Sequence, residues 1–241
     1  MSDYPVIAIP DIHGQLDLLN QAFDWIAKDE VANAPLVFLG DYVDRGPKCK
    51  EVIDLLIDLT ARRDDVTCLM GNHDSLMLTF PGDPFFIHPI IERPLRWLDQ
   101  PLGGRATLKS YGVDVSEERS FEDIAADTKE AVPAAHWAFL KGLVRMHETE
   151  KHVFVHAGIR PGVPLDQQDP EEVYWIRAGF LDDETIHPKM VVHGHTVVDF
   201  PTRYVNRINC DAGAAKGRWI HPVVIEGDDA FALGPNGRLK L

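Results

Sequence analysis

Carboxylate, amide and imidazole side chains follow five separate apolar segments of this sequence. The clearest segment runs from Pro35 to Pro47 and reads P-L-V-F-L-G-D-Y-V-D-R-G-P. Its apolar run, 36–39, is short enough for a buried strand, and Gly40 separates that run from two carboxylates and a guanidinium. Four other segments repeat the arrangement, and the candidate metal ligands are Asp11, His13, Asp41, Asn72, His156 and His195.

These side chains supply the oxygen and nitrogen donors that Mn, Fe, Zn and similar divalent ions accept. No thiolate is among them, which argues against a structural zinc site. Two such ions roughly 3.5–4 Å apart can clamp the attacking and leaving oxygens of a phosphoryl transfer, and Asp41 is placed to bridge them. Taken singly, His156 or His195 would more often be a hydrogen-bonded strand-end residue, and Asn72 a turn residue. Five segments that all carry ligand types favour a shared site.

The elements that must position these residues follow from periodicity. Strands are predicted at 4–9, 36–39, 66–70, 152–155 and 190–192, and helices at 15–29 and 48–62. This alternation indicates βαβ units and a largely parallel sheet, whose strands bind ligands at their carboxyl ends. Strands at 205–210, 219–226 and 230–233 are expected to form a terminal meander that makes the second sheet mixed.

Residues 78–147 are punctuated by proline and glycine, with helices predicted at 121–131 and 134–145. We interpret this region as an insertion that covers one end of the sheet, within a single domain of residues 1–241. Insertions at strand ends commonly carry specificity.

Composition limits the class of protein. The 241 residues are 45% hydrophobic and 26% charged, which is ordinary for a globular chain. The net charge of −14 argues against nucleic acid as a partner and requires a local positive centre for any anionic substrate. The three cysteines have no paired spacing, and neither a signal peptide nor a membrane span is evident. A cytoplasmic protein with no membrane partner is therefore expected.

Five motifs together resemble the phosphoprotein phosphatase family of the calcineurin-like metallophosphoesterases. In chain order they are D-x-H-G at 11–14, G-D-Y-V-D-R-G at 40–46, G-N-H-D at 71–74, H-A-G at 156–158 and G-H-T at 194–196. The resemblance implies an α/β fold in which two mixed β-sheets form a sandwich flanked by helices, a four-layer αββα arrangement with a helical insertion. It also implies two divalent metal ions, Mn²⁺ first, with Fe, Zn, Ni or Co as alternatives.

The resemblance assigns roles residue by residue. A first metal is held by Asp11, His13 and the bridging Asp41, and a second by Asp41, Asn72, His156 and His195. His193 is expected to support the site from its strand rather than to bind metal.

The resemblance also implies a mechanism. A metal-bound hydroxide attacks phosphorus directly, His73 is the general acid for the leaving oxygen, and Asp44 orients its imidazole. Arg45 and Arg177 clamp the phosphoryl group, and Asn72 contributes to substrate binding. Arg105 is expected to form a surface salt bridge, with contact to substrate as the alternative reading.

The substrate remains open at this stage. Asp74 stands where protein phosphatases usually have Glu, and in this it resembles the symmetrical dinucleoside tetraphosphate hydrolases. Those hydrolases usually lack the acid at the Asp44 position. Phosphorylated Ser/Thr of proteins is therefore the first substrate class, with a dinucleoside tetraphosphate or another small phosphate ester or anhydride as the alternative.

A rival from another class, an inactive metal-binding module, predicts loss of a ligand or of the acid pair, and all of these residues are present. The oligomeric state cannot be inferred.

Overall fold

The computed structural model describes residues 5–91 and 93–241. The first strand lies at Val6–Ile9, and Tyr4, its predicted first residue, is outside the described residues. The α-helices are α1 (Leu16–Ile26), α2 (Cys49–Arg62), α3 (Asn72–Thr79), α4 (Gly104–Ser110), α5 (Phe121–Ala131), α6 (Ala134–Lys141) and α7 (Pro170–Trp175), with 3₁₀ turns η1 (Leu165–Gln167) and η2 (Ala214–Lys216). The strands are β1 (Val6–Ile9), β2 (Leu36–Phe38), β3 (Val66–Cys68), β4 (Met146–Glu148), β5 (His152–Val155), β6 (Met190–His193), β7 (Thr202–Arg203), β8 (Arg207–Asn209), β9 (Val223–Glu226), β10 (Asp229–Gly234) and β11 (Gly237–Lys240).

Two mixed sheets confirm the predicted fold class. The first has the order β11-β10-β9-β1-β2-β3, and the second has the order β4-β5-β6-β8-β7. Strands β1, β2 and β3 are parallel, as are β5, β6 and β8. Since the ends of parallel strands meet at one edge, each sheet delivers the residues that follow its parallel strands to a common edge.

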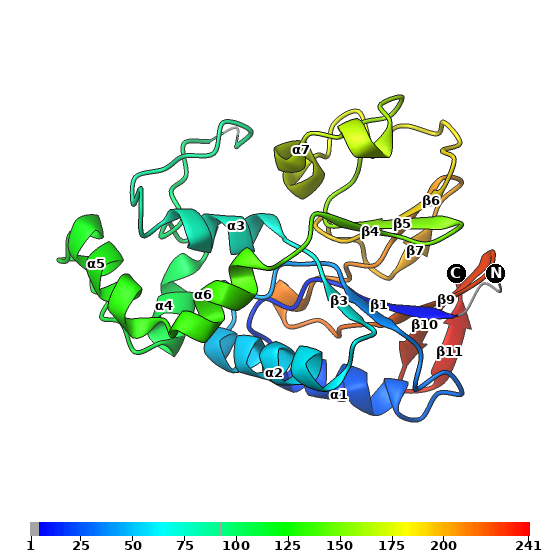
Figure 1. Cartoon of the computed structure of the whole chain (residues 1–241), viewed down its shortest axis with the longest axis horizontal. Coiled ribbons are helices and arrows are strands. Elements are labelled where there is room, and N and C mark those ends of the chain that lie inside the picture. Colours follow the sequence, from blue (N-terminus) through cyan, green and yellow to red (C-terminus); the bar gives the residue numbers. More distant parts are fainter. Residues whose placement is uncertain (1–4, 92) are drawn as a thin grey trace.

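Four layers stack in the order helix, sheet, sheet, helix. In Figure 1, α1 and α2 lie below the first sheet, the second sheet lies above it, and α7 covers the second sheet. Alternating residues of β1 face the two sides, because Ile7 packs with the helices whereas Ala8 packs between the sheets. In β5, Phe154 faces the core between the sheets, while Val153 packs toward α7. This period of two is the pattern of strands buried on both faces.

The C-terminal strands correct one prediction. Of the three strands predicted for the terminal meander, only the first, β8, joins the second sheet, whereas β9, β10 and β11 extend the first. Strand β9 pairs antiparallel with β1, with Ile225 opposite Val6 and Val223 opposite Ala8. The free edge of the fully buried β1 needs a hydrogen-bonding partner, and β9 supplies one. The first sheet is therefore mixed through its C-terminal strands, and the second through its antiparallel edges β4 and β7.

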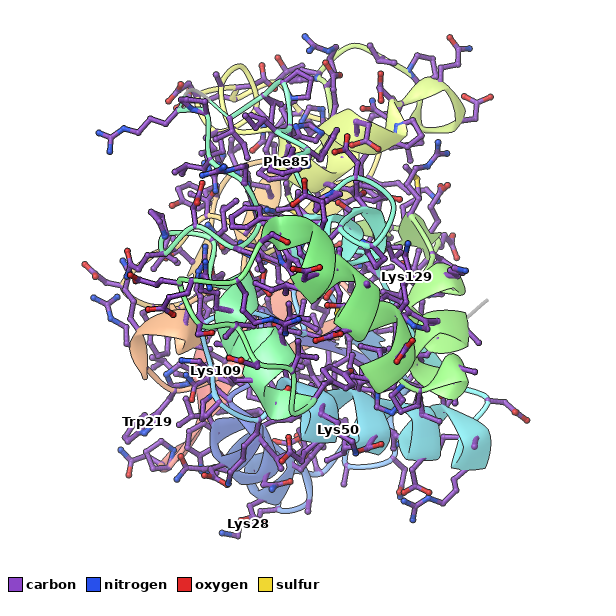
Figure 2. The ribbon with its side chains drawn as sticks, turned by 90° about the vertical axis from the view of Figure 1, so that its left-hand side faces the viewer. Lys28, Lys50, Phe85, Lys109, Lys129 and Trp219 are labelled. Carbon is purple, nitrogen blue, oxygen red and sulfur yellow. The ribbon has the colours of Figure 1, made fainter. Side chains whose placement is uncertain are left out.

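The insertion forms α4, α5 and α6 beside the first sheet. Figure 2 looks onto this region, with Lys109 of α4 and Lys129 of α5 among its outer side chains. Ser120 caps α5 by accepting a hydrogen bond from the Asp123 amide. Helix α6 ends at Lys141 rather than at Arg145, because the chain then turns toward β4.

The insertion shares the hydrophobic core of the first sheet. Its buried side chains, among them Trp97, Leu108 and Ile124, belong to the cluster that also contains Ile7 and Leu56. We take this shared core as support for one domain over residues 1–241, with 78–147 as the insertion. No helix in the described parts of the chain is long and apolar enough to cross a bilayer.

Candidate active site

The predicted metal ligands converge at the carboxyl edges of the two sheets. Asp11 and His13 follow β1, Asp41 follows β2, and Asn72 begins α3 directly after β3. The second sheet contributes one residue after β5 and one after β6. All six side chains are buried, and they are Asp11, His13, Asp41, Asn72, His156 and His195.

The backbone of this edge is held in an unusual conformation. Every non-glycine residue with positive φ in the described chain belongs to the candidate site, and these residues are His13, Asp41, Asp44, Arg45 and His195. Left-handed backbone costs free energy for residues with a Cβ and persists only where surrounding contacts enforce it. Close packing adds a second constraint, since a Cβ at Gly71 would collide with the Asp41 carboxylate and one at Gly194 with that of Asp11.

Asp74 fixes the loop that carries Asp41. Its carboxylate accepts hydrogen bonds from the backbone amides of Asp41 at 2.8 Å, Tyr42 at 3.0 Å and Gly71 at 3.0 Å. The acid in the G-N-H-D motif therefore ties the β2 loop to the start of α3. The two side chains that would share a metal, Asp41 and Asn72, are positioned by these contacts.

Hydrogen bonds aim the imidazoles at the centre of the site. His13 Nδ1 donates to the Val43 carbonyl at 2.8 Å, and His156 Nδ1 donates to the Leu39 carbonyl at 2.8 Å. The Nε2 atom of each ring then carries the lone pair that a metal can bind. Burial lowers the pKa of both histidines, which keeps them in the neutral form that binds metal.

Asp41 lies between two groups of potential ligand atoms. His13 Nε2 is 3.5 Å from one Asp41 carboxylate oxygen, and His156 Nε2 is 3.5 Å from the other. The ligand atoms of His13, Asp41 and His73 lie within 4.8 Å of one another, and so do those of Asp41, His156 and His195. The first triad holds His73 where the predicted ligand set has Asp11, whose carboxylate lies 4.0 Å from His13 Nε2. The two triads share the Asp41 carboxylate and fit a dinuclear metal site.

The arrangement of the donor atoms fits a bound cation. Asn72 Oδ1 lies 2.9 Å from His156 Nε2, whose ring proton is already donated at Nδ1. Where both atoms present lone pairs, a cation coordinated by both makes the contact favourable. Asp11 also favours a nearby cation, because burial and the nearby Asp211 and Asp41 carboxylates raise its pKa well above the usual value. The residues present therefore fit bound divalent metal.

Asp44 and His73 form a buried pair beside this cluster. His73 Nδ1 donates to Asp44 Oδ2 at 2.6 Å. The same carboxylate accepts from Trp97 Nε1 at 2.8 Å and from the Thr107 hydroxyl at 2.6 Å. Burial raises the pKa of Asp44 and lowers that of His73, while the Thr107 and Trp97 hydrogen bonds oppose the effect on Asp44.

The predicted arginines lie at the mouth of the site. Arg45 donates to His13 Nε2 at 2.6 Å and to His73 Nε2 at 3.0 Å. Arg177 lines the same cavity of about 560 Å³, together with Arg45, Asn72 and His73. Burial lowers the pKa of Arg177, and the Asp41 and Asp11 carboxylates partly offset this. Both guanidinium groups thus face a shared space large enough for a phosphoryl group.

Three supporting residues were not found from the sequence. Asp211 follows β8 and accepts from the Gly213 amide at 2.8 Å, close enough to Asp11 to raise its pKa. It stands at a strand end, and this position is a signal that could have identified it. Trp97 and Thr107 come from the insertion, where nothing in the local pattern marks them. His193 is buried and contacts the Gly194 carbonyl through Nδ1, as expected for a supporting strand residue.

Comparison with known proteins decides the family. The sequence profile of the calcineurin-like phosphoesterases matches residues 4–199. The chain belongs to this family. The two buried His/Asp triads agree with this assignment, because they fit a dinuclear metal site. The sequence of this chain is 45% identical over 75 residues to a Caenorhabditis elegans protein named provisionally as a serine/threonine-protein phosphatase. That match spans 31% of this chain and only 20% of the relative.

Solved structures share the fold of this phosphoesterase over nearly its full length. A protein described provisionally as a diadenosine tetraphosphatase superposes with a TM-score of 0.67, at 20% identity, over 98% of this chain and 96% of its own. The cold-active protein-tyrosine phosphatase of a psychrophilic Shewanella species gives a TM-score of 0.61, at 18% identity, over 100% of this chain and 82% of its own. At these identities the likeness establishes the fold.

Proposed function

We propose that this phosphoesterase hydrolyses phosphomonoesters, with phosphorylated Ser or Thr side chains of proteins as its first substrate class. The observation that carries the proposal is the buried Asp44–His73 pair at the edge of the cavity lined by Arg45 and Arg177. The alkoxide that leaves from phosphoserine is strongly basic, so its departure needs a positioned proton donor. An imidazole held by a buried carboxylate provides one.

Two divalent ions complete the site in this proposal, and Mn²⁺ is the first candidate. Asp11, His13 and Asp41 would hold one ion, and the other would be held by Asp41, Asn72, His156 and His195. When bound, such ions lower the pKa of a coordinated water and neutralise charge on the phosphoryl group.

The remaining roles fall to the protein. Arg45 and Arg177 bind phosphoryl oxygens through their guanidinium forks and orient the ester for attack. Once Arg45 turns from His73 Nε2 to the phosphoryl group, His73 carries at Nε2 the proton for the leaving oxygen, and Asp44 accepts from Nδ1 to keep the imidazole charged and aimed. Asn72 bonds substrate as well as metal. No phosphoenzyme is formed.

A second candidate is hydrolysis of a dinucleoside tetraphosphate or a related small phosphate anhydride. Asp74 in the G-N-H-D motif favours it, because protein phosphatases usually have Glu at this position. The retained Asp44 and the local likeness to a protein named provisionally as a serine/threonine phosphatase favour the first candidate.

Product analysis with added Mn²⁺ separates the two candidates. The metal-loaded protein is incubated with a phosphoserine peptide and, separately, with diadenosine tetraphosphate. Release of phosphate from the peptide at the higher kcat/KM supports the first candidate, whereas predominant cleavage of the dinucleotide replaces it with the second. Lack of turnover on both and on p-nitrophenyl phosphate would refute phosphomonoester hydrolysis and leave a binding module.

A further inference from the structure

A second cavity adjoins the candidate active site at Arg45. The cavity that contains His73 and Arg177 measures about 560 Å³, and its neighbour measures about 1020 Å³. Arg45 lines both, so the two spaces lie on either side of this residue. One phosphoryl group occupies far less than either volume, which leaves the larger cavity for another part of the substrate.

Cationic side chains outnumber carboxylates in this larger cavity. Arg96, Arg105 and Lys216 join Arg45 as its basic lining, and Asp99 and Glu117 are its acidic lining. Arg96 pairs with Asp99 at 3.5 Å, and with Arg45 included the lining carries a surplus of two positive charges, in a chain with 24 Lys and Arg against 38 Asp and Glu. A local field opposite in sign to that of the whole protein attracts anions specifically to this place.

Two contacts to backbone carbonyls hold the Arg105 guanidinium at the side of this cavity. Its Nε donates to the Leu98 carbonyl at 3.2 Å, and another guanidinium nitrogen donates to the Val115 carbonyl. Its expected surface salt bridge is not found within residues 5–91 and 93–241, and this corrects the sequence-based reading. The Phe121 ring packs against two of these cations: the Arg105 guanidinium lies 5.9 Å and the Arg96 guanidinium 4.7 Å from the ring centre.

Lys216 enters the cavity from the C-terminal part of the chain. It ends the 3₁₀ turn η2, which begins just after the Gly213 amide bonded to Asp211. Lys216 is exposed, and no carboxylate pairs with it in the described part of the chain. Burial raises the pKa of Asp211 to about 6, and the Lys216 ammonium group is among the weaker influences that oppose this rise.

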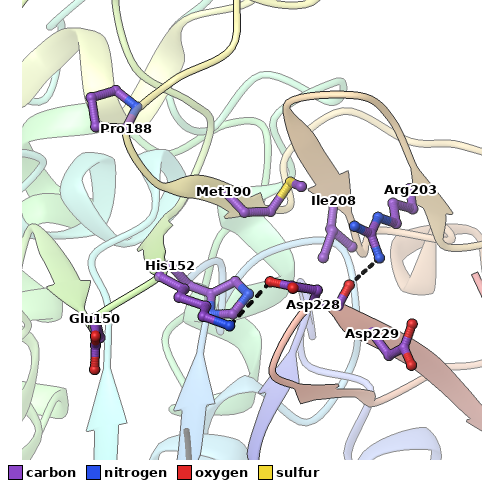
Figure 3. Close-up of a pocket in the computed structure, with 9 residues that line it drawn as sticks. Glu150, His152, Pro188, Met190, Arg203, Ile208, Asp228 and Asp229 are labelled. Atoms are coloured by element: carbon purple, nitrogen blue, oxygen red, sulfur yellow. Dashed lines mark hydrogen bonds and ion pairs between the residues drawn. The ribbon is translucent and has the colours of Figure 1, made fainter. Parts of the chain in front are cut away.

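Another cavity, at the opposite ends of the strands, lacks this surplus. Figure 3 shows its lining, which includes Glu150, Asp228 and Asp229. Lys151 lies 3.3 Å from the Asp228 carboxylate, and Arg203 donates to the Asp228 carbonyl. Of these two cavities, only the one beside Arg45 has more cationic than acidic side chains in its lining.

We propose that the cavity lined by Arg96, Arg105 and Lys216 binds a second anionic group of the substrate, next to the phosphoryl group held at Arg45. This inference rests on the proposed function, because it assigns the part of the substrate that the reaction leaves intact. The second group is either a distal phosphate of a nucleotide or an acidic residue beside the phosphorylated one. Both present the oxyanions that guanidinium and ammonium groups recognise.

The test removes one charge without disturbing a structural contact. Lys216→Gln is compared with Lys109→Gln, which neutralises an exposed lysine of α4 outside the cavity. The metal-loaded proteins are assayed with p-nitrophenyl phosphate, a phosphoserine peptide with neutral flanks, the same peptide with glutamate flanks, and diadenosine tetraphosphate. Binding of the two peptides in a non-hydrolysable phosphonate form is measured in parallel by fluorescence anisotropy.

We expect Lys216→Gln to lower kcat/KM for a substrate with a second anion by about two- to fivefold, the scale of one exposed ion pair. The aryl phosphate and the neutral peptide should be unaffected, Lys109→Gln should match wild type, and about 0.5 M salt should erase the difference. A defect confined to the dinucleotide identifies a distal phosphate, and one confined to the glutamate peptide identifies a flanking acid. Equal losses on all substrates, or no loss on any, would overturn the proposal. If no substrate is turned over, the proposed function fails, and the anisotropy difference between the two peptides still decides the anion site.

Discussion

Replacing Thr107 by valine should impair the Asp44–His73 pair and leave the metal ligands unchanged. The hydroxyl of Thr107 donates to Asp44 Oδ1 at 2.6 Å and accepts from the Asp44 amide at 2.8 Å. Valine keeps the shape of the side chain but offers neither contact. The Asp44 carboxylate is fully buried, so no water replaces the lost donor.

The expected effect follows from hydrogen bonding to a buried charge. One hydrogen bond to a charged group contributes about 1.5–3 kcal/mol. Losing it raises the pKa of Asp44 further, because burial already favours its neutral form and the Thr107 contact opposes that shift. A neutral Asp44 no longer keeps the His73 imidazole protonated. If the whole free energy of the lost hydrogen bond is lost from the stabilisation of the transition state, kcat falls about 10- to 150-fold for a leaving group that needs a proton.

The assay compares leaving groups of different basicity. Turnover of an alkyl phosphate such as a phosphoserine peptide should fall by this factor, whereas p-nitrophenyl phosphate, whose leaving group departs without a proton, should be nearly unaffected. Thr128→Val is the matched control, because Thr128 is also buried in the insertion but donates to the Ile124 carbonyl, away from the site. Equal losses on both leaving groups in a folded, metal-loaded Thr107→Val protein would refute the role of Asp44.

Three further predictions test the metal site, the acid and the pH dependence of stability. His73→Asn should retain metal by elemental analysis while turnover of a poor leaving group falls about 10²-fold or more, and wild-type activity would exclude His73 as the acid. Asp41→Asn should lower the metal content measured on the same instrument, and unchanged occupancy would contradict a bridging role. Arg238 bonds Asp29 at 2.7 Å, which lowers the pKa of Asp29 from its ordinary 3.8. The stabilisation is complete above that ordinary value and fades as the pH falls through the lower folded-state pKa, so Arg238→Gln should flatten the acid limb of urea-unfolding stability against pH. An unchanged acid limb would show that this pair does not contribute.

The C-terminal strands show where local pattern stops being informative. The strand residues of β9 were recognised as strand formers, but their partner was not, because pairing with β1 joins segments more than 200 residues apart. The same holds for the hydrogen bonds of Trp97 and Thr107 to Asp44, 53 and 63 residues away along the chain. The hydrophobic periodicity of the insertion does not indicate that Trp97 and Thr107 bind the Asp44 carboxylate.

The sequence by itself determined the ligand types, their places directly after apolar strands, and hence their convergence, because the ends of parallel strands meet at one edge of a sheet. It also determined the alternation of strands and helices that builds the two layers around that edge. Only the tertiary structure decided that the insertion holds Asp44, that Asp211 adds a carboxylate near Asp11, and that Arg105 and Lys216 face one cavity from distant segments. The physical reason is that side-chain periodicity records burial within one element, whereas contacts between elements are set by packing of the whole chain.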